Sequence, residues 1–273
     1  MKITIQDVAK KANVSVATVS RVMNGNYPVK SETRETVLKV INELNYIPNM
    51  QARELTKQKS TTIGVVVPSI TNMFFTELVN GIETELKSNS LSIILACTNG
   101  DYEEEQKCVN NLISRNVSGI IIADPDTESI NNKFYDTIAH KLPIVFINSE
   151  HTNSNISYVS NDEASGAKTA LEYLLNKGHK NIIFVRGKDS YSYDIKEKVY
   201  IELMNNQKTF DSSKIINIGN GNTIDTVDNT MNIFLNILKK PSFTAVFACN
   251  DLMAVGVLNA CKKLGIQVPN QIS

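Results

Sequence analysis

The stretch VSVATVSRVMNGN, residues 14–26, decides the fold of the N-terminal part of this chain. We expect a helix here that begins after Ser15 as its N-cap. At helical spacing one stripe of it is apolar and holds Val19, Val22 and Met23. The opposite side is small and polar with a single cation, and it holds Ala17, Ser20, Arg21 and Asn24. Because its side chains are small, this side of the helix can approach the surface of a partner closely.

Two further helices are predicted around this stretch. TIQDVAKKANV, residues 4–14, begins with Thr4 as a possible N-cap and has Asp7 three residues later, a loose capping box. Its expected inward residues are Val8, Ala12 and Val14. SETRETVLKVINELNY, residues 31–46, has Ser31 as the expected N-cap. Its apolar residues at helical spacing are Val37, Leu38, Ile41 and Leu44. We therefore expect a small three-helix unit.

A small polar helix placed second, after a tight turn, fits the recognition helix of a helix-turn-helix. Ser15 and Thr18 suit phosphates, because helix N-termini and hydroxyls bind anions. Arg21 can read guanine through O6 and N7, and Val16 or Ala17 can meet a thymine methyl. The alternative, an ordinary surface helix, stays open on these residues alone.

The charge distribution agrees with a polyanion partner for this unit. Residues 1–60 carry ten Lys and Arg against five Asp and Glu, whereas residues 61–273 carry 18 against 23. A small basic segment on a mildly acidic body indicates a unit that binds polyanions attached to one that binds something else. Chance clustering of surface lysines would give the same count.

Composition bounds the class of protein further. No apolar run approaches the roughly 18 residues of a membrane span, and Gln6 and Asp7 interrupt the apolar residues that a signal peptide would need. The four cysteines stand apart without a C-x-x-C pair, at Cys97, Cys108, Cys249 and Cys261. Scattered thiols favour a reducing compartment, so we expect a cytoplasmic location, no membrane association and no metal site.

From residue 62 the chain alternates apolar strands with amphipathic helices. TIGVVVP, LSIILAC, VSGIIIAD and LPIVFIN form one series of strands, and NIIFVRG, KIINIG and TAVFACN form a second. Near-continuous apolar strands are typical of parallel sheets buried on both faces. Helical patterns at 74–89, 103–116, 162–178, 196–206, 224–240 and 251–265 separate them. We expect two doubly wound lobes, 62–160 and 161–273, with a ligand cleft at the strand ends.

The segment between these two parts, residues 48–61, has its own character. Pro48 ends the preceding helix, and Asn49 can cap a short helix that carries Arg53, Lys57 and Lys59. So brief a helix is marginal in water. It is either a plain linker or a segment that folds on a partner.

Taken together, TIQDVAKKANVSVATVSRVMNGN, then YIPNMQARELT, then TIGVVVPSITNMFF closely resemble the lactose-repressor/galactose-repressor family of bacterial transcription regulators. The resemblance covers nearly the whole chain, and within the family the stretch 14–26 is most similar to catabolite-control regulators. It implies a helix-turn-helix headpiece (1–47), a hinge (48–61) and a periplasmic-binding-protein-like α/β core (62–273). It also implies a homodimer that binds a pseudopalindromic operator, most often as a repressor, with no cofactor.

The resemblance assigns residues to both sites. In the hinge, Leu55 would wedge into the minor groove and Ala52 would let two hinge helices approach. The DNA-binding set is Thr4, Ser15, Val16, Ala17, Thr18, Ser20, Arg21, Asn24, Asn49, Ala52, Arg53 and Leu55. The effector-binding set is Asn72, Phe74, Asp124, Asn161, Asp162, Lys196 and Asp251. Asp251 is the preferred effector ligand, although it can equally be the N-cap of the following helix.

Two departures from the family bear on the function. Sugar-responsive members carry an arginine where this chain has Lys196, and lysine cannot replace the planar guanidinium fork. Catabolite-control types, which respond chiefly to a phosphoprotein partner, also have lysine there. The effector is therefore either a sugar, sugar phosphate or nucleobase, or a phosphoprotein co-regulator.

The second departure is at Ser273, where the family continues for roughly 60 more residues, so we expect a core that is incomplete at its C-terminus. A small-molecule-binding protein that has lost operator binding through this truncation is the alternative function. An enzyme is not expected, because the chain has no P-loop, no G-x-S-x-G and no G-x-G-x-x-G after a strand.

Overall fold

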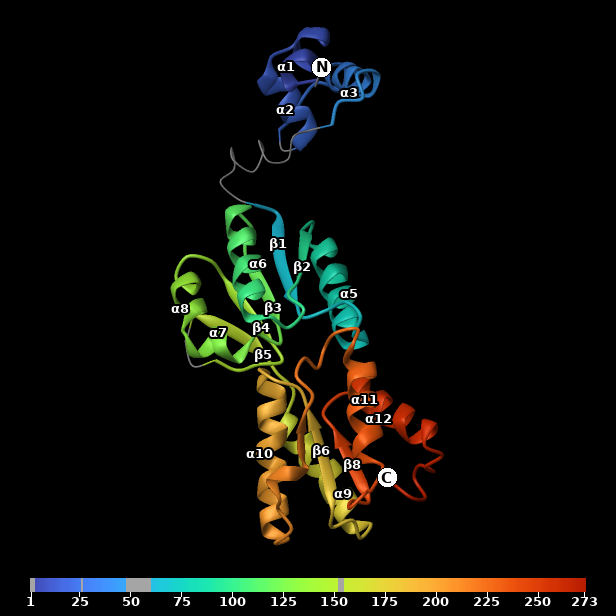
Figure 1. Cartoon of the computed structure of the whole chain (residues 1–273). Coiled ribbons are helices and arrows are strands. Elements are labelled where there is room, and N and C mark those ends of the chain that lie inside the picture. Colours follow the sequence, from blue (N-terminus) through green and yellow to red (C-terminus); the bar gives the residue numbers. More distant parts are fainter. Residues whose placement is uncertain (1–2, 26, 48–59, 152–154) are drawn as a thin grey trace. The chain divides into compact units, whose positions relative to one another are not determined.

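The computed structural model describes residues 3–25, 27–47, 60–151 and 155–273 (Figure 1). The chain divides into two compact units, Met1–Ser60 and Thr61–Ser273. The hinge prediction, including Asn49, Ala52, Arg53 and Leu55, falls on residues 48–59 and lies outside the described residues. In the part that is described, no helix has the length and apolar character needed to cross a membrane.

The described part of the first unit has three helices, α1 (Ile5–Lys11), α2 (Val16–Asn24) and α3 (Ser31–Glu43). The predicted caps of the first two are confirmed: Thr4 and Asp7 form a capping box on α1, and the Ser15 side chain accepts from the Thr18 amide. The core of the unit is almost entirely small and β-branched, with buried Val8, Ala9, Ala12, Val19, Val22, Val37 and Val40. The three-helix prediction is therefore confirmed.

Two details of α3 differ from expectation. The N-cap is Lys30, which makes no side-chain capping bond, and Ser31 is the first helical residue. Leu38 is 44% exposed, whereas Val40 is buried. A register that buries Val37, Val40 and Leu44 spaces them three and four residues apart, and this leaves Leu38 on the solvent side.

The second unit begins with a parallel five-stranded sheet in the order β2-β1-β3-β4-β5. Its strands are β1 (Thr62–Val67), β2 (Ser92–Cys97), β3 (Ile120–Ala123), β4 (Ile144–Ile147) and β5 (Ile156–Val159). Side chains alternate between its faces. Val65 and Val67 pack with Phe75 of α5 (Met73–Ser88), and Val66 packs with Leu112 of α6 (Tyr102–Ser114) on the opposite face. The short helices α7 (Thr127–Asn131) and α8 (Phe134–Ala139) follow β3.

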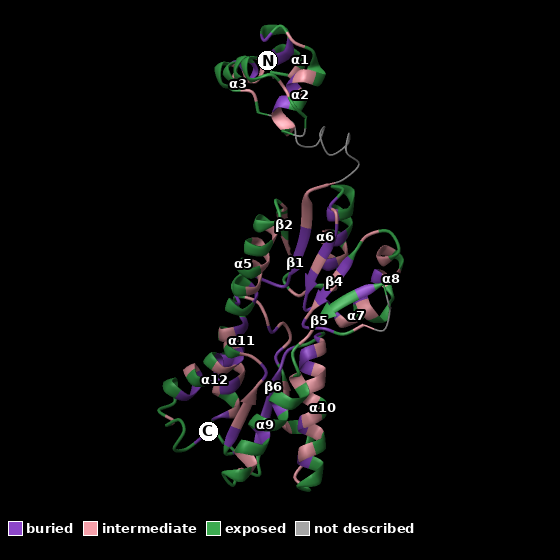
Figure 2. Ribbon diagram, turned by 180° about the vertical axis from the view of Figure 1, so that it is seen from behind, coloured by how far each residue is buried: buried purple, intermediate pink, exposed green. Residues whose placement is uncertain are grey.

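The second sheet of this unit is parallel and three-stranded, in the order β7-β6-β8. Its strands are β6 (Ile182–Arg186), β7 (Ile215–Asn217) and β8 (Ala245–Ala248). The helices around it are α9 (Glu163–Asn176), α10 (Tyr191–Asn206), α11 (Thr226–Ile237) and α12 (Asp251–Lys263), with the 3₁₀ turn η1 (Ser212–Lys214) before β7. Figure 2 shows buried residues along the inner strands β1 and β6, whereas the edge strands β2 and β7 have none. The fold class, an all-α headpiece with a doubly wound parallel α/β core, is confirmed.

Some elements were not predicted. Strand β5 has three exposed residues out of four, so it lacks the continuous apolar pattern of a buried strand. Helices α7 and α8 are shorter than two turns, and α10 begins at Tyr191 rather than at residue 196. Short elements that are stabilised by their neighbours leave little periodic signal in the sequence.

Candidate functional site

The first candidate site is the exposed face of α2. Val16 is 40% exposed, and Ser15, Ala17 and Arg21 are exposed as well, whereas Val19 and Val22 are buried. The stripe and the polar side therefore lie as the spacing predicts. Thr18, Ser20 and Asn24 are half-buried on the margin of this face.

Local hydrogen bonds hold the polar side chains of α2. The Ser15 and Thr18 hydroxyls lie 2.9 Å apart, and the Ser15 oxygen accepts from the Thr18 amide at 3.1 Å. Asn24 donates its side-chain amide to the Ser20 hydroxyl at 3.1 Å. Each bond joins residues three or four positions apart, which are neighbours on a helix surface. The face is thus ordered without being covered by the rest of the unit.

Among the described residues, Thr4 is the one predicted DNA contact that is not on α2 or its cap. Its hydroxyl donates to an Asp7 carboxylate oxygen at 2.7 Å, and its amide donates to the same oxygen at 2.8 Å. Both bonds lower the pKa of Asp7, and the bond from the Thr4 hydroxyl has the larger effect. The Thr4 hydroxyl proton is therefore committed to the capping box of α1.

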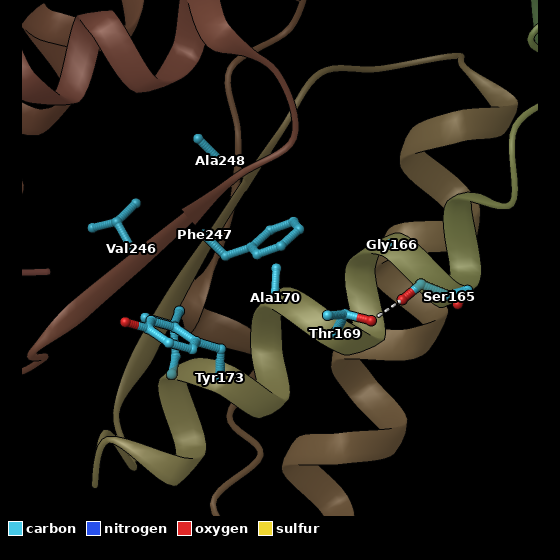
Figure 3. A pocket seen from close by; sticks show the side chains of 9 residues that line it. Ser165, Gly166, Thr169, Ala170, Tyr173, Val246, Phe247 and Ala248 are labelled. Atoms are coloured by element: carbon cyan, nitrogen blue, oxygen red, sulfur yellow. Dashed lines mark hydrogen bonds between the residues drawn. The ribbon is translucent and has the colours of Figure 1, made fainter.

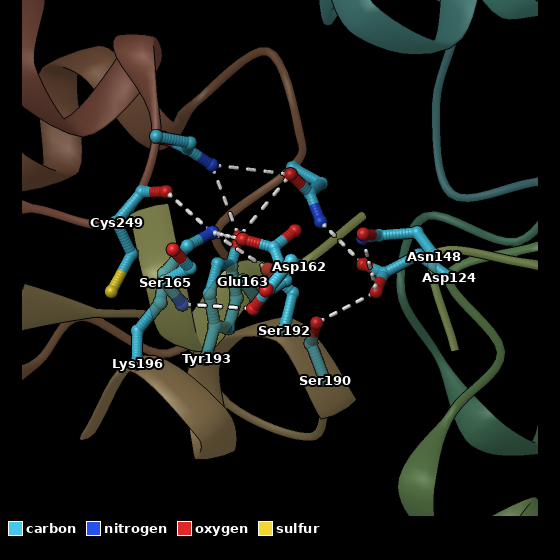
Figure 4. Close-up of polar contacts among 12 residues, drawn as sticks. Asp124, Asn148, Asp162, Glu163, Ser165, Ser190, Ser192, Tyr193, Lys196 and Cys249 are labelled. Atoms are coloured by element: carbon cyan, nitrogen blue, oxygen red, sulfur yellow. Dashed lines mark hydrogen bonds and ion pairs between the residues drawn. The ribbon is translucent and has the colours of Figure 1, made fainter. Parts of the chain in front are cut away.

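The second candidate site is a polar cluster between the two sheets, centred on Asp124 (Figure 4). Asp124 follows β3 with a left-handed backbone, φ 51°, and is buried. Its carboxylate accepts from the Ser190 hydroxyl at 2.7 Å, from Asn222 at 3.0 Å and from Asn148 at 3.3 Å. Burial raises the pKa of Asp124 to about 6, opposed by the Ser190 hydrogen bond and the charge of Lys196.

Asn222 connects this carboxylate to the rest of the cluster. Its side-chain oxygen accepts from Asn72 at 3.0 Å, from the Tyr193 hydroxyl at 3.2 Å and from Asn250 at 3.2 Å. The residue before Asn222 has to be glycine, since a Cβ at Gly221 would lie 2.6 Å from the Tyr193 hydroxyl oxygen. The loop before α11 therefore approaches Tyr193 closely enough to share these bonds.

Lys196 lies next to this cluster but is paired with its own neighbours. Its ammonium lies 2.8 Å from a Glu163 carboxylate oxygen and donates to the Ser192 hydroxyl at 2.7 Å. Both side chains of the ion pair are largely buried, at 16% and 15% exposed. A phosphate or carboxylate ligand would have to compete with Glu163 for this cation.

The structure thus brings Asn72, Asp124 and Lys196 together among the predicted effector residues. Asp162, the N-cap of α9, lies beside Glu163 at the margin of the cluster (Figure 4). Phe74 is 45% exposed at the start of α5, and Asn161 is exposed just before α9. Asp251 is the exposed first residue of α12, and the N-cap is Asn250. The N-cap interpretation of Asp251 is therefore wrong, because the carboxamide of the preceding residue accepts from the Met253 amide at 3.0 Å.

Sequence reasoning missed much of the cluster. The additional members are Asn148, Ser190, Ser192, Tyr193, Asn222 and Asn250. Asn148 and Asn250 each stand soon after a predicted strand, at the edge where parallel sheets bind ligands. That position was a usable signal for both. Asn222 and Tyr193 carried none, because their role depends on contacts to residues far away in the chain.

The second unit has several cavities, and two of them bear on the site. One of about 570 Å³ is lined by Ser69, Thr71 and Asn99 from loops of the first sheet and by Asn220, Thr223, Ile224, Asp225 and Asn229 beyond β7. It adjoins the cluster through neighbouring residues and holds hydroxyl and amide groups suited to a polyol. The other, about 650 Å³, lies between α9 and β8 and is mainly apolar, with Tyr173 and Phe247 among its walls (Figure 3). Among the described residues, no three His, Cys, Asp or Glu side chains gather as a metal site requires.

Comparisons with known proteins place the two parts of the chain in known families. Residues 4–49 match the family described as bacterial regulatory proteins, lacI family, and residues 63–272 match the periplasmic binding protein domain. Catabolite control protein A of Staphylococcus xylosus is 35% identical over all of this chain and 81% of its own length, and that of Priestia megaterium is 34% identical with the same coverage.

A solved structure adds the architecture. The Lac repressor dimer bound to operator and the anti-inducer ONPF superposes with a TM-score of 0.80 at 27% identity, over all of this chain and 81% of that one. The chain thus has a headpiece with an exposed face on α2 and a core with a polar cluster between its two lobes. A DNA-facing part and a ligand-binding part are the two components of a regulatory protein. The chain belongs to the lacI family of bacterial transcriptional regulators, which confirms the resemblance found in its sequence.

Proposed function

We propose that this chain binds a pseudopalindromic operator as a homodimer in the cytoplasm and represses transcription there, with α2 in the major groove. The observation that carries this is the α2 face, where Arg21 stands exposed among small polar residues that are fixed by local hydrogen bonds. A bidentate arginine reads guanine, and the hydroxyls at the helix N-terminus bind phosphate. The solved Lac repressor, described as a dimer bound to operator, supports the same arrangement here.

The DNA contacts proposed on described residues are Thr4, Ser15, Val16, Ala17, Thr18, Ser20, Arg21 and Asn24. For Thr4 the methyl group is the available part, because its hydroxyl and amide protons are both bound to Asp7. The hinge contacts Asn49, Ala52, Arg53 and Leu55 complete the set. Leu55 would open a base step in the minor groove.

The core is proposed to bind the effector in its interlobe cleft. Asn72, Phe74, Asp124, Asn161, Asp162, Lys196 and Asp251 are the proposed contacts. We propose two classes of effector: a small molecule, which is a sugar, sugar phosphate or nucleobase, and a phosphoprotein co-regulator. The pairing of Lys196 with Glu163 favours an uncharged small molecule over an anionic one, because no extra cation is then needed.

The test uses a duplex selected by the wild-type chain from a random library. We expect Arg21→Ala to weaken binding by about 1–3 kcal/mol and to relax the preference at one base position, while other positions keep theirs. Fluorescence anisotropy at fixed salt measures both, with a scrambled duplex of equal length as the control. Equal wild-type affinity for selected and scrambled DNA would contradict the proposed function.

The hinge assignment has a separate readout. Leu55→Ala should reduce the bend of the selected duplex, because an apolar wedge is what unstacks the base step. Circular-permutation or phasing gel shifts measure the bend directly. An unchanged bend at full occupancy would refute the wedge while leaving the α2 assignment intact.

A further inference from the structure

Arg21 makes one contact that reading a base does not require. Its guanidinium carbon lies 5.5 Å from the centre of the Tyr27 ring, within the range of a cation–π interaction. Tyr27 is 62% exposed, so its ring is not held in the core of the headpiece. Burial therefore does not explain why this ring lies next to Arg21.

The chain around Tyr27 explains how the ring reaches Arg21. Helix α2 ends at Gly25, whose left-handed backbone (φ 69°) closes the helix as its amide donates to the Arg21 carbonyl at 3.0 Å. Pro28 follows Tyr27 and restricts its backbone to extended conformations. Gly25 thus ends α2, and Pro28 limits the backbone freedom of Tyr27.

We propose that Tyr27 is a positioning residue for DNA readout, which rests on the proposed function of Arg21. A guanidinium that stacks on an aromatic ring does so with its planar face, whereas the N–H groups that pair with guanine O6 and N7 lie on its edge. Stacking therefore leaves the reading edge open. It also restricts a long side chain whose rotamer freedom would otherwise be lost on binding.

A double-mutant cycle on the selected duplex tests this proposal. Tyr27→Ala should weaken binding about two- to fivefold, as expected for an exposed cation–π pair, and should blunt discrimination at the base position that Arg21→Ala identifies. Tyr27→Phe keeps the ring and should stay within about twofold of wild type. In an Arg21→Ala background, Tyr27→Ala should have no further effect.

The chain supplies a matched control in its second unit. Lys177 lies 5.4 Å from the ring centre of Tyr173, which is 61% exposed. Tyr173→Ala removes the same kind of pair and should leave DNA affinity unchanged. Thermal unfolding followed by circular dichroism checks that the headpiece of each variant is folded.

Three outcomes would overturn the positioning role. The first is an equal loss from Tyr27→Ala with and without Arg21, since Tyr27 would then act on its own. The second is a loss in Tyr27→Phe as large as in Tyr27→Ala, because the hydroxyl would then be the active group. The third is a loss of affinity with unchanged base discrimination. Failure of the wild type to discriminate selected from scrambled DNA would count instead against the proposed function.

An independent observation concerns the cleft. Side chains from the two sheets satisfy one another: Asn72 donates to Asn222 across it, and both Asn222 and Ser190 donate to Asp124. The Thr127 amide also donates to the Asp189 carbonyl at 3.3 Å, and Asp126 forms an isolated antiparallel bridge with Ser190. Polar groups at which a ligand would bind are therefore already paired with groups of this chain.

We infer that this network couples the two lobes to each other, which concerns regulation of the proposed effector site. Hydrogen bonds to a buried carboxylate are stronger than those between neutral groups, and an unpaired buried partner is costly. Opening the cleft would expose or orphan several partners of Asn222 at once. A small molecule that enters here must replace the contacts of Asn222 rather than fill an empty site.

Hydrogen exchange on the full chain without DNA tests the inference. Asn222→Ala removes the link between Asn72 and Asp124 and should speed exchange of the Thr127 amide about tenfold, because that amide is bonded across the lobes. The Val66 amide, in the middle of the first sheet, should keep its wild-type rate. Asn232→Ala, an exposed asparagine on α11, is the matched control.

If exchange of the Thr127 amide is unchanged in Asn222→Ala, or changes equally in Asn232→Ala, the inferred coupling of the lobes is wrong. Asp124→Asn gives a second variant, because an amide nitrogen would replace one accepting oxygen and should also speed exchange. Neither result depends on DNA binding. The experiment therefore separates this inference from the proposed function of α2.

Discussion

The exposed face of α2 and the interlobe cluster use the same kinds of side chain, hydroxyls, carboxamides and one charged group, but they differ in what those groups bind. On α2 the bonds are local, as from Asn24 to Ser20 four residues away. In the cleft they join distant residues, as from Asn72 to Asn222. Local pairs orient polar groups and leave the face open to a partner, whereas long-range pairs bury the groups and satisfy them.

The two units also differ in how they are packed. The headpiece core is made of valine and alanine, with Tyr46 as a partly buried ring at its edge. The second lobe buries Phe184, Tyr200 and Phe234 completely. Because buried area sets most of the stability, the headpiece is expected to be the less stable unit. A surface that binds a large partner can gain part of its stability from that partner.

The largest effect is expected in the second lobe. Phe184 is fully buried and stacks with Tyr200 at 4.9 Å and with Phe247 at 5.5 Å between ring centres. Phe184→Ala should cost about 3–5 kcal/mol of unfolding free energy, measured by urea denaturation. The headpiece transition should remain where it is, because the chain divides at residue 60. A shift of both transitions together would show that the units are not independent.

The next effect concerns pH. Burial raises the pKa of Glu105 to about 7, although the Tyr135 hydroxyl donates to it at 2.5 Å. Its folded-state pKa is above the unfolded value, so the stability it contributes is present below pH 4.5 and is lost as pH rises through about 7. We expect Glu105 to make the core less stable at pH 8 than at pH 5 by about 2 kcal/mol.

Glu105→Gln should flatten this dependence, as measured by urea denaturation at the two pH values. Below pH 3.8 the headpiece should show the opposite slope, because hydrogen bonds from Thr4 lower the pKa of the exposed Asp7. That stability is present above pH 3.8 and is lost as pH falls further. An unaltered slope in Glu105→Gln would remove Glu105 as its source.

The smallest effect is expected at the start of α1. Thr4→Ala removes both side-chain bonds of the capping box and should cost the headpiece about 1 kcal/mol. Thermal unfolding of the headpiece transition measures it. Thr36→Ala, at an exposed position inside α3 where the hydroxyl bonds the Glu32 carbonyl, is the control and should change little. Equal losses would mean that the capping box contributes no more than an ordinary helix position.

Much of this protein was predictable because its signals are local. The caps Thr4 and Ser15, the buried stripe of α2 and seven of the core strands follow from side-chain chemistry and periodicity over fewer than 20 residues. The exposed face with Arg21 follows in the same way. Strand β5 was not predictable, because its exposed residues Ser157, Tyr158 and Val159 give no apolar run and only pairing with β4 makes it a strand.

The sequence by itself determined the family, the order of the long helices and the buried strands, and the polar face of the recognition helix. The tertiary structure alone decided which polar residues meet in the cleft, that Asn250 rather than Asp251 caps α12, and that Lys196 is paired with Glu163. The physical reason is range. A helix face depends on residues three or four apart, whereas the Asn72–Asn222–Asp124 contacts require two sheets to be folded and placed before any bond can form.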